Sequence, residues 1–151
     1  MKQQRGFGMI AAVVVLVILS SLAAAIVSFS SGQQIASAQD LMASKSWQAA
    51  KAGNEWGLFF ALKTMTWPTS AATCDAAAVS ETLDLSADTG FHVKVSCQSI
   101  LRNEGETSPG VAKTVRIYTI TAVACNAVSC PAADASSPTY VERTRVVMAT
   151  N

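Results

Sequence analysis

The chain has 151 residues, of which half are apolar, 14% are charged and 7% are aromatic. Eleven Lys and Arg residues against ten Asp and Glu residues leave a formal charge of +1. This near-neutral balance argues against a nucleic-acid-binding protein, which would carry a basic face, and the apolar fraction argues against a disordered chain. The single histidine argues against a histidine-based metal site, so no metal or cofactor is expected.

The first element in chain order is a long apolar segment. No charged residue occurs between Arg5 and Asp40, and the 19 residues 9–27 include only two polar ones, Ser20 and Ser21. A helix needs about 20 apolar residues to cross the hydrocarbon core of a bilayer, and a buried helix of a soluble protein would normally show a polar face. The segment is therefore predicted to be a membrane-spanning helix.

The flanking charges predict the orientation of this helix. Lys2 and Arg5 precede it, and the first charge behind it is Asp40. The positive-inside tendency then places the N-terminus in the cytoplasm and the remaining chain outside. The four cysteines agree with export, because an even number of cysteines in a small exported domain is typical of disulfides.

Three interpretations of this N-terminus are open. It could be an uncleaved signal anchor, or a secretory signal peptide with a small-residue cleavage site at residues 23–25. The apolar run is rather long for a signal peptide. The third interpretation rests on the residues that begin the segment, Lys-Gln-Gln-Arg-Gly-Phe-Gly-Met-Ile at positions 2–10.

This short basic leader, followed by Gly-Phe and an apolar run, resembles the class III signal of type IV pilins and pseudopilins. In that family a prepilin peptidase cuts after the glycine and methylates the new N-terminal residue. The resemblance implies a leader of residues 1–6 and a cut between Gly6 and Phe7. Removal of Lys2 and Arg5 would change the formal charge from +1 to −1.

The chain departs from the family pattern at Ala11, where pilins usually have a glutamate five residues into the mature chain. In pilins that glutamate pairs with the N-terminal amine of a neighbouring subunit. A carboxylate without such a partner would be costly in an apolar helix bundle. The absence of the glutamate resembles certain minor pilins and tip pseudopilins and argues against a major pilin.

A second stretch, Ala-Ala-Lys-Ala-Gly-Asn-Glu-Trp-Gly-Leu at positions 49–58, resembles the end of the long helix in minor pilins of the mannose-sensitive haemagglutinin (MSHA) type. The resemblance covers residues 5–62. It implies partners of three kinds: other pilin subunits through their N-terminal helices, a prepilin peptidase, and the bacterial inner membrane before assembly. It also implies a periplasmic C-terminal region that later forms part of an extracellular pilus.

The helix is predicted to continue beyond the assembly segment 7–28 as an amphipathic stretch over residues 29–63. The first proline of the chain is Pro68. Apolar residues recur every seven positions, at Ile35, Met42, Ala49 and Trp56, and give a broken stripe. We expect this stripe to pack on a following sheet, with Trp56 and Phe59 at the contact.

Residues 64–151 are predicted to form a small disulfide-bonded β-region. Residues 91–97 alternate strictly, with Phe91, Val93, Val95 and Cys97 on one face and His92, Lys94 and Ser96 on the other. Residues 103–110 are predicted to be a polar turn, and 114–124 and 140–149 to be strands. The expected fold class is α+β and pilin-like: a long N-terminal helix, its first half transmembrane, packed against a small antiparallel β-sheet.

Four cysteines allow three pairings. Cys125 and Cys130 enclose four residues between two predicted strands, so they are expected to pin that turn. Cys74 would then bond Cys97 and tie the loop after the helix to the first strand. A metal site is a poor alternative, because the spacings lack the paired short intervals of zinc-binding cysteines.

Enzyme signatures are missing from the sequence. It contains no nucleophile elbow, phosphate loop or zinc-protease motif, and no catalytic residue is assigned. Arg143 and Arg145 share a strand face, either as guards of an edge strand or as a contact for an acidic neighbour. The sequence therefore predicts a minor pilin. The alternatives are a type II secretion pseudopilin and a secreted or anchored disulfide-bonded binding domain.

Overall fold

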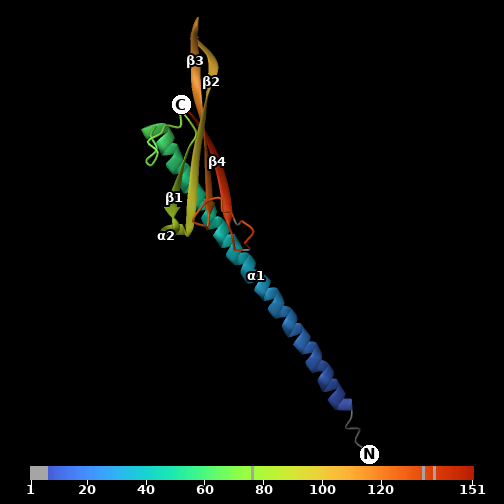
Figure 1. Cartoon of the computed structure of the whole chain (residues 1–151). Coiled ribbons are helices and arrows are strands. Elements are labelled where there is room, and N and C mark those ends of the chain that lie inside the picture. The colour runs from blue at the N-terminus through green and yellow to red at the C-terminus, as the bar shows by residue number, and fades with distance from the viewer. Residues whose placement is uncertain (1–6, 76, 134, 138) are drawn as a thin grey trace, which may run out of the picture. The chain divides into compact units, whose positions relative to one another are not determined.

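The computed structural model describes residues 7–75, 77–133, 135–137 and 139–151 (Figure 1). The elements in chain order are α1 (Phe7–Phe59), a π-helical turn (Phe60–Thr64), β1 (Val79–Leu85), α2 (Ser86–Thr89), β2 (Phe91–Ser108), β3 (Val111–Cys125) and β4 (Glu142–Thr150). An N-terminal apolar helix and a four-stranded antiparallel sheet confirm the predicted α+β class. The chain divides into two compact units, Met1–Asp40 and Leu41–Asn151.

The helix ends in the second unit. After Thr64 the chain turns at Met65, which has a φ of 57° in the left-handed region that commonly closes a helix. Pro68 follows three residues later and cannot continue a helix, because it lacks a backbone N–H. The chain then forms the loop that leads to β1.

The sheet is a meander with the strand order β1-β2-β3-β4, in which every neighbouring pair is antiparallel. The alternation predicted for residues 91–97 is confirmed, because Phe91, Val93, Val95 and Cys97 are buried and the residues between them are not. Strand β1 has no counterpart in the prediction. Its burial alternates weakly, since only Val79 is fully buried.

The predicted polar turn over residues 103–110 is wrong for most of its length. Strand β2 continues to Ser108 and β3 begins at Val111, so only Pro109 and Gly110 connect them. Beyond the regions paired with β1 and β4, the two strands form a ribbon in which both faces meet water. Polar side chains therefore carry no burial penalty there, and the amino-acid composition of the ribbon resembles that of a loop.

The core of the second unit lies between α1 and one face of the sheet. The helix and the π-helical turn behind it contribute small buried residues: Ser46, Ala49, Ala50, Gly53, Gly57 and Ala61. A Cβ placed on Gly53 would lie 2.7 Å from Cγ1 of Val93, and one placed on Gly57 would lie 2.7 Å from Cγ2 of Ile120. The helix therefore lies as close to the sheet as a glycine backbone allows.

The predicted contact residues of the helix are half correct. Trp56 is partly buried and packs on the core, but Phe59 is 52% exposed. Phe59 follows Gly57 by two residues, which places it about 200° around the helix from the face that meets the sheet. Phe60 packs on the core instead. The seven-residue stripe also lies partly outside the interface, since Met42 is 46% exposed.

Candidate functional site

The most prominent candidate site is the surface of α1 from Gly8 to Val27. These 20 residues have a mean hydropathy of 3.0, and none of the stretch is buried by the rest of the chain. By length and composition the helix could cross a membrane. Apolar surface of this extent is unfavourable in water, which is compatible with a helix surrounded by lipid.

The two hydroxyl groups of this segment are compatible with an apolar surrounding. Ser20 Oγ donates to the carbonyl oxygen of Val17 at 2.9 Å, and Ser21 Oγ donates to that of Ile18 at 2.8 Å. Both hydroxyl groups therefore have partners within the helix itself. An unpaired polar group in hydrocarbon would cost several kcal/mol.

The predicted processing site lies at the start of this helix. Gly6 and the side chain of Phe7 fall outside the described residues, while the helix itself begins at Phe7. Ala11 is exposed within the apolar surface, so the position where pilins usually have a glutamate is here a small uncharged residue. Processing at Gly6 stays a prediction.

A shallow groove runs along one face of the same helix. It is lined by Leu22, Ala25, Ile26, Phe29 and Gln33. The small Ala25 lies between larger neighbours, which gives the helix surface a recess of the kind that receives a side chain of a second helix. The apolar surface is thus shaped as well as uncharged.

Both predicted disulfides are confirmed. Cys74 bonds Cys97 and ties the loop after the helix to β2, and Cys125 bonds Cys130 directly after β3. Arg116 strengthens the first attachment, because its guanidinium donates to the carbonyl oxygen of Asp75 at 3.1 Å and lies 3.4 Å from the Asp75 carboxylate. None of the four cysteines is left as a free thiol.

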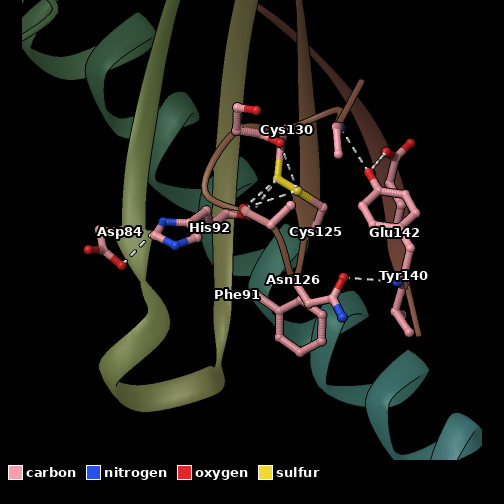
Figure 2. Close-up of a disulfide and its surroundings, with 12 residues drawn as sticks. Asp84, Phe91, His92, Cys125, Asn126, Cys130, Tyr140 and Glu142 are labelled. Atoms are coloured by element: carbon pink, nitrogen blue, oxygen red, sulfur yellow. Dashed lines mark hydrogen bonds and ion pairs between the residues drawn. A yellow bond between two sulfur atoms is a disulfide. The ribbon is translucent and has the colours of Figure 1, made fainter. Parts of the chain in front are cut away.

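The second disulfide closes the first part of the segment that connects β3 to β4 (Figure 2). Asn126, at the start of this segment, bonds to residues at its end. Asn126 Oδ1 accepts a hydrogen bond from the Val141 N–H at 3.0 Å, and its Nδ2 donates to the carbonyl oxygen of Thr139 at 2.7 Å. The Asn126 N–H also donates to the carbonyl oxygen of Val141 at 3.3 Å. The sequence interpretation missed Asn126, whose only signal is an amide directly after a cysteine.

Tyr140 contributes a further attachment near the same segment. Its hydroxyl donates to the carboxylate of Glu142 and accepts from the Ala132 N–H at 3.1 Å (Figure 2). Burial is the main cause that raises the pKa of Tyr140 above its ordinary value. The phenol therefore stays protonated and keeps its hydrogen bond to Glu142 at neutral pH.

His92 and Asp84 lie close together on the polar face of the sheet. His92 Nδ1 lies 3.4 Å from Asp84 Oδ1, and the Asp84 side chain is largely exposed. Hydrogen bonds from Ser86 are the main cause that lowers the pKa of Asp84, and His92 contributes less. Within the described ranges, no group of three or more His, Cys, Asp or Glu residues could hold a metal ion.

The three tryptophan side chains contact other side chains of the same unit. Trp67 is fully buried and packs edge-to-face on Trp56, with ring centroids 4.9 Å apart. Trp47 is 49% exposed, and the guanidinium of Arg145 lies 4.2 Å from its ring centroid. Arg145 therefore has a cation–π partner in its own chain.

Comparison of the chain with protein-family models, curated proteins and solved structures gave no match.

Proposed function

We propose that this chain is a minor pilin of a type IV pilus of the MSHA type, similar to the pilus biogenesis protein MshP. It is a structural subunit with no catalytic role. The observation that carries the proposal is an uncharged apolar helical stretch, Gly8–Val27, none of which is buried and which begins two residues after the Arg5-Gly6 sequence.

In this proposal the helix acts in two surroundings. Residues 7–28 first anchor the chain in the bacterial inner membrane, with the C-terminal unit in the periplasm. A prepilin peptidase removes residues 1–6, and the helix then leaves the lipid and packs with other pilin helices in the fibre or its initiation or tip complex. Lipid tails are as apolar as the helix, so close packing supplies the driving force, and small residues such as Ala11 and Ala25 permit it.

The C-terminal unit fits an exported subunit. Both of its disulfides join segments that are distant from the apolar helix in sequence. Disulfides persist in the periplasm and outside the cell, where the surroundings are oxidising. They would hold the unit together after the fibre leaves the cell.

The N-terminus of membrane-extracted protein tests this proposal. Mass spectrometry should find a chain that starts at methylated Phe7, and only in cells that contain prepilin peptidase. Substituting Gly6→Val should abolish this cleavage, whereas the matched control Gly8→Val should leave it intact. A start directly after Ala25 would indicate an ordinary secreted domain, and an intact Met1 a simple anchor. Recovery with a secretion pseudopilus, and not with sheared pili, would favour a type II secretion pseudopilin.

Ala11→Glu is expected to change the abundance of the subunit in the fibre, or its position there. The new carboxylate would lie in an apolar bundle and would be tolerated only beside the N-terminal amine of a neighbour. Purified fibres from cells that express wild type and variant together would give the ratio of the two. An unchanged ratio, with unchanged positions in labelled fibres, would contradict a special role for Ala11.

A further inference from the structure

The two edges of the sheet carry opposite charges. The strand order β1-β2-β3-β4 places β1 at one edge and β4 at the other. Strand β1 and the short helix α2 behind it contain three acidic residues and no basic residue: Glu81, Asp84 and Asp88. Strand β4 contains two arginines and one glutamate: Glu142, Arg143 and Arg145. We call β1 with α2 the acidic edge and β4 the basic edge.

The charges at these two edges do not neutralise each other within one chain. Three ion pairs of a Lys or Arg with a carboxylate occur elsewhere: Lys51–Glu55, Lys113–Glu104 and Arg116–Asp75. Among the described residues, neither arginine of the basic edge forms an ion pair with a carboxylate. In the same part of the chain, no carboxylate of the acidic edge pairs with a Lys or Arg. The carboxylate of Glu142 is bound by the Tyr140 hydroxyl.

Arg145 lacks an acceptor even though part of its guanidinium is shielded from water. The group lies over the ring of Trp47, and its Nη1 atom is buried without a hydrogen-bond partner in the described part of the chain. A cation shielded from water is unfavourable unless an opposite charge lies near it. Arg143 is exposed, and its Nη1 donates only to the carbonyl oxygen of Glu142, at 2.9 Å. A carboxylate supplied from outside the chain would offset both positive charges.

The strand register places the opposite charges at the two ends of the same rows of residues. Followed across the sheet from strand to strand, the row of Arg145 ends at Glu81. The row of Arg143 ends at Leu83, directly beside Asp84. A second copy displaced sideways along these rows therefore brings its acidic edge beside the basic edge of the first. In this arrangement the α1 helices of both copies run in the same direction, as copies anchored in one membrane require.

We propose that the basic edge of one copy of this chain contacts the acidic edge of a second copy, through Arg143 and Asp84. Contact between two like edges would instead set arginine against arginine or carboxylate against carboxylate. The contact joins side chains and does not extend the sheet, because Thr69 binds Glu81 at the acidic edge. It is heterologous, so further copies can add to the row. The inference rests on the membrane anchoring of the proposed function and not on the pilus.

Cross-linking of two differently tagged full-length chains, co-expressed in one membrane, tests this contact. Exposed ion pairs are individually weak and set orientation more than affinity, so the anchored chain is the appropriate sample. One chain carries Thr82→Cys and the other carries Thr144→Cys. These threonines are both exposed and lie at the two ends of one row, one on each edge. All four native cysteines are in disulfides, so a short bis-maleimide reacts only at the introduced thiols.

The unlike pair of cysteines should cross-link at least about fivefold more than either cysteine with itself. Arg143→Glu in the Thr144→Cys chain should lower this yield about fivefold, and Asp84→Arg in the other chain should restore it. Restoration would also show that the first variant is folded. The matched control Arg102→Glu reverses an exposed arginine of β2 outside both edges and should leave the yield unchanged.

Three results would overturn the contact: no cross-link, equal yields for like and unlike pairs, or a yield that Arg143→Glu does not change. The contact and the proposed function can fail separately. A chain that starts at methylated Phe7 without this cross-link would refute the contact alone. An intact Met1 together with the cross-link would refute the pilus assignment and leave the contact in place.

Discussion

Replacing Gly57 with leucine should lower the free energy of unfolding of the C-terminal unit by about 2–3 kcal/mol, as expected for overpacking of a tight core. Even the first atom of a side chain there would lie 2.7 Å from Cγ2 of Ile120 and 2.9 Å from Cγ1 of Val95. Neither methyl group is the far end of a flexible side chain, so the helix must move away from the sheet. Denaturant unfolding, followed by the fluorescence of the packed pair Trp56 and Trp67, measures the loss.

The matched control is Ala52→Leu on the exposed side of the same helix. Leucine and alanine are both good helix formers, so this change should alter the free energy of unfolding by less than about 0.5 kcal/mol. Gly57→Leu by itself raises helix propensity by about 0.8 kcal/mol. A net loss of stability would therefore have to come from the contact with the sheet. Equal stabilities of Gly57→Leu and the control would show that the helix does not meet the sheet at Gly57.

Removing the Cys74–Cys97 disulfide by a double alanine substitution should cost about 3 kcal/mol of unfolding free energy, against about 2 kcal/mol for Cys125–Cys130. The reason is the length of chain that each bond closes, since the sequence separations are 23 and 5 residues. A longer closed loop removes more freedom from the unfolded chain. Denaturant unfolding of the two double variants under oxidising conditions gives both values.

The two pairs are well matched for this comparison. Each contains one fully buried cysteine, Cys97 or Cys125, and one that is at most 5% exposed, Cys74 or Cys130. The loss of packing from the sulfur atoms is therefore similar, and the difference reports loop closure. A larger loss for the Cys125–Cys130 pair would contradict this explanation and would instead assign the energy to the segment closed by Asn126.

Several features of the protein can be predicted from the amino-acid sequence alone. The apolar helix is one, because a long run without charged residues favours an apolar surrounding whatever the rest of the fold is. The alternation of residues 91–97 is another, since a strand with one buried face repeats every two residues. The disulfide pairing also follows from local order, because Cys125 and Cys130 lie close in sequence and leave Cys74 for Cys97.

Other features depend on contacts between distant segments. Gly53 and Gly57 carry no apolar side chain, so hydrophobic periodicity finds Trp56 but adds the exposed Phe59 and leaves out the two glycines at the closest contact. The ribbon formed by β2 and β3 has the composition of a turn, because strands with two wet faces need no alternation.

The sequence by itself determined that residues 7–28 form an apolar helix, that an α+β unit follows, and that its four cysteines pair as they do. These properties rest on composition, short-range periodicity and spacing along the chain. Only the tertiary structure decided which residues of the helix meet the sheet, where the strands end, and how they pair. Those depend on close approach and strand register, which small side chains and backbone hydrogen bonds set without leaving a hydrophobic pattern in the sequence.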